Sequence, residues 1–127
     1  MTLRTYLLIG GGAFVGAILR YQLGLWAINL GFNPTTGFPW GTFFINVTGS
    51  FLLGLFMSSP SLAALPAPTR LLLTTGFCGG YTTFSTFSFE LIVFFTTGQT
   101  FLALTYGIGS AIAAPIACLI GYSLLKP

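Results

Sequence analysis

The chain has 127 residues, of which 54% are hydrophobic, 17% are aromatic and 4% are charged. Soluble domains carry about 25% charged residues, so this composition cannot cover a water-facing surface. The formal net charge of +3 comes from four basic side chains and one acidic side chain, which are too few to neutralise a nucleic-acid backbone. Nucleic acid is therefore excluded as a partner, and membrane lipid is the expected surrounding.

The side chains on which most enzymes depend are missing or isolated. The sequence has no histidine, and its only carboxylate side chain is Glu90. The two cysteines, Cys78 and Cys118, lie far apart in the sequence and lack the spacing of a zinc site. We therefore expect no enzymatic activity and interpret both cysteines as small apolar packing residues.

Uncharged stretches between turn signals predict four membrane-spanning helices. No charge occurs between Arg20 and Arg70, or between Glu90 and Lys126, and a span needs about 20 mainly apolar residues. Segments rich in proline and glycine divide these stretches, which predicts helices near 5–29, 40–58, 69–97 and 100–125. Because the connections are short, we expect one all-α membrane domain over residues 1–127, with antiparallel sequence neighbours.

Positive charge is divided unevenly between the two sides of this predicted bundle. With four spans, Arg4, Arg70 and Lys126 share the side of the termini, and Arg20 alone is left for the opposite side. The positive-inside rule then favours termini in the cytoplasm. With so few charges, insertion in both orientations stays open.

The first predicted helix repeats glycine on the face that also carries Arg20. Gly12, Gly16 and Gly24 follow one another at multiples of four residues, a spacing that lets membrane helices approach closely. An arginine within a span usually faces protein or water. Arg20 could therefore pair with backbone carbonyls or Glu90, or it could draw anions toward the protein.

The second predicted helix gathers its polar and small residues on one face. Thr42, Asn46, Gly49 and Ser50 recur at spacings of three and four, while large apolar residues occupy the other face. Two interpretations of Asn46 stay open. Its amide could hydrogen-bond to a neighbouring helix, or it could offer its NH₂ group to an anion in a pore.

The third predicted helix contains a segment that is poorly suited to a continuous helix. Gly79 and Gly80 are followed by a β-branched run, and both features lower helix propensity. We therefore predict a break near Gly79–Thr83, with backbone carbonyls and N–H groups free to bind ions. The alternative is an unbroken helix whose glycines serve a close packing contact. The pattern gives Tyr81 no role.

Beyond this segment, aromatic and polar side chains share a helical face. Phe84 and Phe87 are three residues apart, and the electropositive edges of their rings can attract an anion, although such a pair can also serve packing alone. Glu90 follows at the same spacing, and an intramembrane carboxylate is a functional candidate. In the fourth predicted helix, Tyr106 and Ser110 offer hydroxyl groups to whatever the third helix presents.

The spacing of these residues forms motifs in all four predicted helices. The motifs read Gly12-x3-Gly16-Ala17-x2-Arg20-Tyr21, Gly41-Thr42-x3-Asn46-x2-Gly49, Gly76-x2-Gly79-Gly80-x-Thr82-Thr83-Phe84-Ser85-Thr86-Phe87-Ser88-x-Glu90 and Tyr106-x3-Ser110. Together they closely resemble the Fluc, or CrcB-type, fluoride channel family over nearly the whole chain. The resemblance implies passive export of fluoride from bacteria across the inner membrane, by an antiparallel dual-topology homodimer with two pores along its interface.

The resemblance also implies a pore lining. Phe84 and Phe87 would form an aromatic box whose ring edges contact fluoride, with Asn46 as a donor beside them. Further polar positions along the fluoride pathway would be Thr42, Ser85, Thr86, Tyr106 and Ser110.

Four more residues receive roles from the same resemblance. Arg20 would attract anions from a vestibule, and Glu90 would lie at the far end of the pathway. Backbone carbonyls of Gly79 and Thr82 from both chains would hold a structural sodium ion at the dimer interface.

Two other interpretations compete with a fluoride channel. A proton-coupled small multidrug exporter also has four short helices and one essential carboxylate, but its glutamate is expected in the first helix, whereas Glu90 lies in the third. A purely structural membrane subunit would show the same glycine repeats. Neither alternative accounts for the glycine pair followed by the Thr, Phe and Ser run.

Overall fold

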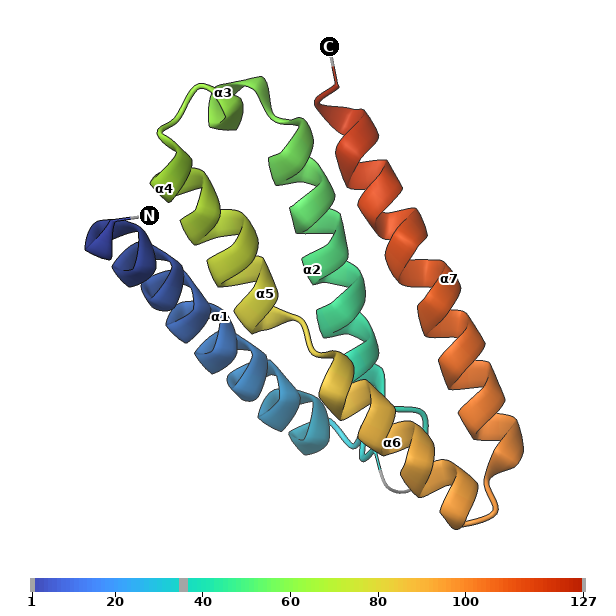
Figure 1. Cartoon of the computed structure of the whole chain (residues 1–127). Coiled ribbons are helices and arrows are strands. Elements are labelled where there is room, and N and C mark those ends of the chain that lie inside the picture. The colour runs from blue at the N-terminus through green and yellow to red at the C-terminus, as the bar shows by residue number, and fades with distance from the viewer. Residues whose placement is uncertain (1, 35–36, 127) are drawn as a thin grey trace.

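The structure is a computed structural model that describes residues 2–34 and 37–126, and this part of the chain contains helices and no strands. Residues 1, 35–36 and 127 of the predicted domain lie outside the described part. The elements follow one another as a set of long and short helices (Figure 1). They are α1 (Leu3–Asn29), α2 (Trp40–Ser58), α3 (Pro60–Ala63), α4 (Ala67–Leu71), η1 (Leu72–Cys78), α5 (Gly79–Tyr81), α6 (Phe84–Thr96) and α7 (Thr100–Leu124).

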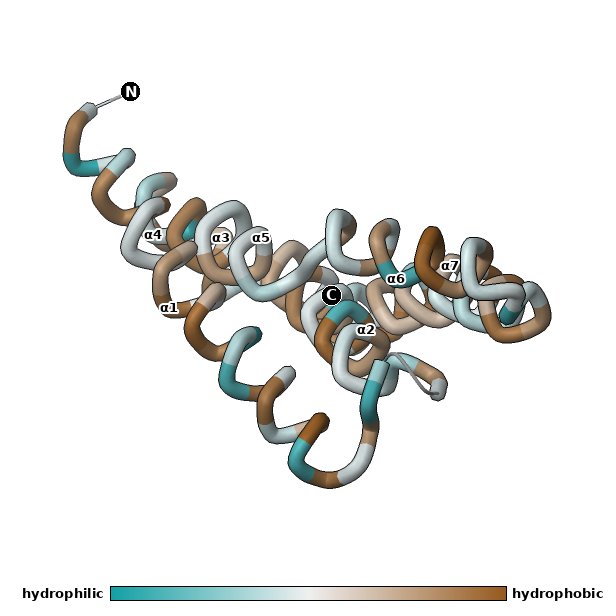
Figure 2. Tube along the Cα trace, turned by 90° about the horizontal axis from the view of Figure 1, so that it is seen from below, coloured by the Kyte–Doolittle hydropathy of each residue, from teal (hydrophilic) through white to brown (hydrophobic). Residues whose placement is uncertain are grey.

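Three of these helices, α1, α2 and α7, are long and apolar enough to cross a membrane. Their bounds lie close to the ranges that the uncharged stretches predict. Hydrophobic residues occur along the length of these helices (Figure 2), and many large apolar side chains are exposed. Exposed apolar side chains on helices of this length suit a lipid surrounding.

The third predicted span consists of two helical parts separated by an extended segment. Residues 67–81 run as a rod through α4, η1 and α5, in which η1 is a π-helix. Thr82 and Thr83 then take extended conformations, with ψ angles of 158° and 116°. The chain re-enters a helix at Phe84, where the Thr83 hydroxyl caps α6 by accepting from the Thr86 N–H at 3.1 Å.

The glycine pair is not itself the break. Gly79 is helical, with φ −66° and ψ −35°, and the extended segment begins three residues later. Gly80 lies at a close contact between α5 and α1, as the alternative interpretation of the glycines had it. A Cβ on Gly80 would lie 2.8 Å from the Cα of Ala13. The glycine therefore allows α1 and α5 to approach closely. The helix is interrupted beyond it, at Thr82 and Thr83.

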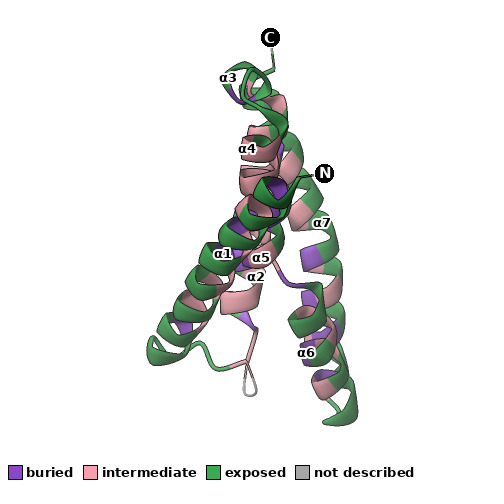
Figure 3. Ribbon diagram, turned by 60° about the vertical axis from the view of Figure 1, so that its left-hand side comes forward, coloured by how far each residue is buried: buried purple, intermediate pink, exposed green. Residues whose placement is uncertain are grey.

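Two helix pairs form the body of the fold. α1 packs along η1 and α5, and α2 packs along α7. Both contacts bring backbones together, because a Cβ on Gly16 would lie 2.8 Å from the N of Tyr81, and one on Gly54 would lie 2.9 Å from the N of Tyr122. At the other end of the molecule, α1 diverges from α6 and α7 (Figure 3).

A small aromatic core packs α6 against α7. Phe94, Ala103 and Tyr106 are buried there, and the rings of Phe38 and Phe87 pack against them. The ring centroids of Phe87 and Tyr106 are 5.0 Å apart, and those of Phe38 and Tyr106 are 5.4 Å apart. This core fixes the face of α6 that carries the candidate site residues.

Candidate functional site

Glu90 lies at a junction of three helices and is almost fully buried. Its carboxylate accepts one hydrogen bond from the Thr42 hydroxyl of α2 at 2.7 Å and another from the Tyr106 hydroxyl of α7 at 2.6 Å. Tyr106 is fully buried and Glu90 is 8% exposed. The two hydroxyls satisfy a carboxylate that would otherwise be costly to bury. The two hydrogen bonds thereby link α2, α6 and α7 through three side chains that lie on three predicted helices.

Asn46 of α2 holds the interruption between α5 and α6. Its Oδ1 accepts from the Thr83 N–H at 2.7 Å, and its Nδ2 donates to the Thr83 carbonyl oxygen at 3.0 Å. In a continuous helix the Thr83 N–H would donate to the carbonyl of Gly79. The side-chain amide replaces that bond, which is how extended backbone is tolerated at membrane depth. An amide NH₂ carries two hydrogens, and this contact uses one of them.

The predicted aromatic residues meet Asn46 and Ser110 at one cavity of about 270 Å³. The ring centroids of Phe84 and Phe87 are 5.7 Å apart with an interplanar angle of 40°. The Ser110 hydroxyl is buried and has no hydrogen-bond partner among the residues that the structure describes, although buried polar groups normally have one. An unpartnered donor, a partly used amide and two aromatic rings therefore line the same cavity.

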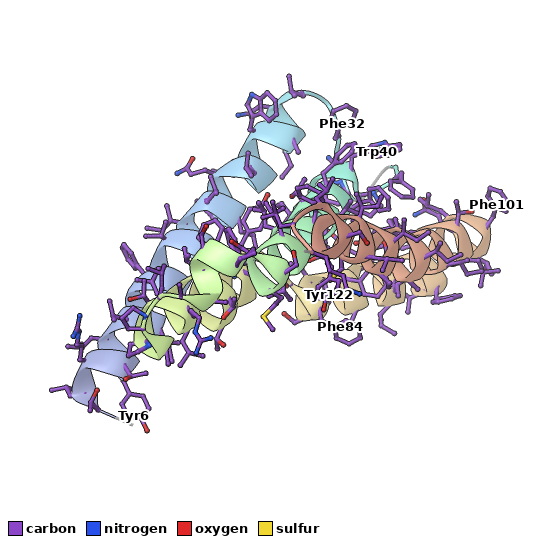
Figure 4. All side chains as sticks on the ribbon, turned by 90° about the horizontal axis from the view of Figure 1, so that it is seen from above. Tyr6, Phe32, Trp40, Phe84, Phe101 and Tyr122 are labelled. Atoms are coloured by element: carbon purple, nitrogen blue, oxygen red, sulfur yellow. The ribbon has the colours of Figure 1, made fainter. Side chains whose placement is uncertain are left out.

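Phe84 differs from Phe87 in its surroundings. Phe87 packs on Tyr106, whereas Phe84 is 79% exposed and extends away from the helices (Figure 4). Most of its ring surface is left uncovered by its own chain.

A second cavity, of about 550 Å³, lies between α1, α2 and α6. It contains the remaining predicted polar residues except Tyr106, namely Arg20, Thr42, Ser85, Thr86 and Glu90. Arg20 and Glu90 line the same space, but among the described residues the carboxylate is bonded by the two hydroxyls rather than by this arginine. The direct ion pair that the sequence left open is not formed within one chain.

The two backbone positions predicted to bind sodium border a third cavity. Gly79 and Thr82 line a space of about 820 Å³ between α2 and the rod 67–81, with Cys78 beside them. Because the Thr83 N–H bonds to Asn46, the Gly79 carbonyl lacks its usual helical donor. No group of His, Cys, Asp or Glu side chains suited to a metal ion occurs in the described part of the chain.

Several residues at the site carry no signal that sequence reasoning could use. Asn46 bonds to Thr83 through the backbone alone, which any residue type other than proline could provide. Tyr81 contacts the Thr48 hydroxyl across 3.0 Å, a pairing of residues 33 positions apart. Pro115 of α7 lines the cavity of Phe84 and Phe87, and a proline within a helix removes one backbone hydrogen bond. The proline was visible in the sequence, but its position beside the aromatic pair was not.

The fold and the site together define a class, a multi-pass helical membrane protein with polar side chains gathered inside it. The model of the CrcB-like, or Camphor Resistance (CrcB), protein family matches residues 7–122. The chain belongs to this family.

Relatives of the chain carry a more specific name. A protein of Chlorobaculum tepidum is 44% identical over 127 residues, which cover 98% of this chain and 96% of the relative. A protein of Rhizobium meliloti is 41% identical over 122 residues, or 94% of each chain, and one of Thermus thermophilus is 40% identical over 124 residues, covering 98% and 95%. All three are named "Fluoride-specific ion channel FluC", which is the name of a channel and not of an enzyme.

Proposed function

We propose that two copies of this chain form a passive, fluoride-selective channel that exports fluoride across the bacterial cytoplasmic membrane. The observation that carries the proposal is the buried, unpartnered Ser110 hydroxyl, which lines one cavity with Phe84, Phe87 and Asn46. The names of the relatives support fluoride as the ion. A channel also requires no catalytic group.

The chemistry of this cavity suits a small anion. Fluoride is strongly hydrated, so a selective path must replace its water with other donors. The Ser110 O–H and the unused N–H of Asn46 can each donate one hydrogen bond, and the edges of the Phe84 and Phe87 rings carry partial positive charge. Thr42, Ser85, Thr86 and Tyr106 extend the polar path toward Glu90 at its far end, and Arg20 attracts anions into the neighbouring cavity.

The chain crosses the membrane four times in this proposal. The rod 67–81 and α6 together supply the third span, and at about 1.5 Å per residue they are long enough for a hydrocarbon layer of about 30 Å. The extended Thr82–Thr83 segment between them is covered by Asn46 and α2, as non-helical backbone within a membrane must be.

The second copy lies antiparallel to the first. Phe84 is 79% exposed beside the cavity that it lines, so one chain alone leaves the aromatic pair open. A partner copy closes the pore along the interface, which yields two pores in a homodimer. The positive-inside rule favours the termini in the cytoplasm, but with only four basic side chains the chain can insert in both orientations.

A structural sodium ion at the dimer interface completes the assembly. The carbonyl of Gly79, freed because Thr83 bonds to Asn46, and the carbonyl of the extended Thr82 fit the role, since unwound backbone carbonyls coordinate sodium in transporters. The same two positions of both copies would hold the ion, which would supply positive charge that keeps the two breaks together.

Removing sodium is expected to weaken the dimer. In detergent, replacing sodium by choline should lower the thermal unfolding midpoint, because an ion that binds only the folded dimer adds about 2.7 kcal/mol of stability at one hundred times its Kd. The measurement is a thermal melt of the purified protein against sodium concentration, with constant ionic strength. If the midpoint is the same in sodium-free buffer and at about 0.1 M sodium, no sodium ion stabilises the dimer and the proposed sodium site is contradicted.

Phe84→Ile is expected to slow fluoride efflux at least about tenfold, which corresponds to about 1.4 kcal/mol of barrier. Isoleucine fills a similar space but lacks a ring edge that can contact an anion. The measurement is fluoride efflux from liposomes, with dimer content checked by size-exclusion chromatography. The matched control is Phe101→Ile, since Phe101 is 85% exposed at the start of α7 and lines none of the three cavities. A wild-type rate of fluoride efflux from a dimeric Phe84→Ile protein would show that the Phe84 ring does not contact fluoride in the pore.

The direct test of the proposal is fluoride efflux from liposomes that contain the purified wild-type chain, with chloride in parallel and with or without a pH gradient. We expect fast efflux of fluoride but not of chloride, at a rate that does not depend on the pH gradient. Export that requires a proton gradient would instead favour the coupled exporter. Absence of fluoride flux from a dimeric protein would reject the proposal.

A further inference from the structure

Tyr81 is the last residue of α5 and lies at the start of the interruption in the third span. Its side chain is 5% exposed, and its ring stacks on Phe77 with centroids 5.8 Å apart and an interplanar angle of 4°. Its hydroxyl contacts the Thr48 hydroxyl of α2 at 3.0 Å. A tyrosine in an apolar surrounding needs such a partner, and α2 provides it.

The direction of this hydrogen bond follows from the other contacts of Thr48. The Thr48 hydroxyl donates to the Phe44 carbonyl oxygen at 2.6 Å, and a hydroxyl has one hydrogen. Thr48 therefore accepts from Tyr81, and Tyr81 is the donor. Thr48 and Tyr81 both line a cavity of about 380 Å³ between α1 and α2, and their hydrogen bond is partly buried there.

The ring of Tyr81 also requires room that one residue of α2 provides. A Cβ on Gly49 would lie 2.9 Å from Cδ1 of Tyr81 and would also collide with the Thr82 side chain. Gly49 is buried, so the ring and the threonine lie against the α2 backbone itself. The glycine that sequence reasoning placed on the polar face of this helix thus accommodates the end of α5.

Two neighbouring points of α2 therefore hold the two ends of the extended segment. Tyr81 bonds to Thr48 on the α5 side, and Thr83 bonds to Asn46 on the α6 side. Thr82 lies between the two anchors. Asn46 bonds to one peptide group, and Tyr81 bonds to α2 at the end of the rod 67–81, just before that peptide group.

We propose that Tyr81 is a positioning residue of the pore, which acts through its hydrogen bond to Thr48 to set the register of the interruption against α2. In this register the Asn46 amide and the Phe84 ring reach the same cavity. The inference rests on the proposed fluoride channel and assigns no contact between Tyr81 and the ion. Without the bond, the Tyr81 end of the rod shifts against α2 while α1 still holds the rest of the rod, and the donors no longer converge.

The test is the unitary fluoride current of single channels in planar bilayers. This current does not depend on how much of the protein is folded, so a merely structural role leaves it unchanged. Tyr81→Phe, which keeps the ring and loses the donor, is expected to reduce it about fivefold, as the loss of a hydrogen bond of about 1 kcal/mol predicts. Thr48→Val should have the same effect, and the double variant should be no worse than either single variant, because one bond is lost in each case.

Two controls separate the outcomes. Thr48→Ser keeps the accepting hydroxyl and is expected to retain the wild-type current, whereas Tyr122→Phe removes a hydroxyl from an exposed tyrosine of α7 and should have no effect. A wild-type current in Tyr81→Phe or Thr48→Val, even with a lowered melting temperature, would overturn the positioning role. Absence of fluoride current in the wild-type protein would instead reject the channel proposal.

Discussion

Asn46→Asp is expected to reduce fluoride efflux roughly a thousandfold while the chain remains helical. A carboxylate cannot donate to the Thr83 carbonyl, and it places a negative charge at the cavity through which fluoride is proposed to pass. Two like charges about 4 Å apart repel by about 4 kcal/mol at an effective dielectric constant of about 20, and each 1.4 kcal/mol of barrier is about tenfold in rate. The measurement is fluoride efflux from liposomes, with helicity followed by circular dichroism.

Asn29→Asp is the matched control for this change. Asn29 is exposed at the end of α1 and lines none of the three cavities, so the same substitution there should leave efflux near the wild-type rate. If Asn46→Asp conducts fluoride as well as Asn29→Asp does, then Asn46 serves only as the clamp of the interruption and not as a pore donor.

Gly80→Val is expected to prevent formation of a stable protein. The side chain would enter the backbone of α1, where a Cβ would already lie 2.8 Å from the Cα and 3.0 Å from the carbonyl carbon of Ala13. Backbone cannot move aside as a flexible side chain does, so the cost should reach or exceed the upper end of the usual overpacking range, about 3 kcal/mol. The measurement is the monodisperse fraction on size-exclusion chromatography and the thermal unfolding midpoint.

Gly10→Val gives the comparison for Gly80→Val. A Cβ on Gly10 of α1 would meet nothing within 4 Å, and valine changes helix propensity equally little in both places. The control variant should therefore purify like the wild-type protein. Equal behaviour of the two variants would show that the close contact between α1 and the rod 67–81 does not hold the chain together.

The long helices could be located from the sequence because charge and turn residues punctuate it. α2 occupies Trp40–Ser58 and α7 occupies Thr100–Leu124, close to the segments between the proline and glycine clusters. The interruption at Thr82 and Thr83 falls inside the predicted range Gly79–Thr83, but the sequence did not show which residues of that range leave the helix. Helix propensity points to Gly79, yet the helix continues to Tyr81, and Asn46 of another helix takes the Thr83 N–H beyond it.

The spacing of residues in the sequence predicts only part of how the candidate site residues are grouped. A helical period places Phe84, Phe87 and Glu90 on one face, but it cannot tell which helix lies opposite. Contacts between distant residues decide that Ser110 reaches the cavity of the aromatic pair and that Tyr106 reaches Glu90 instead. Arg20 and Glu90 were open candidates for an ion pair, and the two hydroxyls on the carboxylate make such a pair unnecessary.

The π-helix η1 has a consequence for how this segment tolerates change in length. A π turn holds one residue more than an α turn, and η1 extends over Leu72–Cys78. Gly12 and Gly16 of α1 present no side chain to this wider segment, since a Cβ on either would collide with its backbone or with that of α5. A deletion of one residue within η1 can therefore be absorbed by a return to α geometry. The two ends of the segment, and the interruption beyond it, would keep their places against α1 and α2.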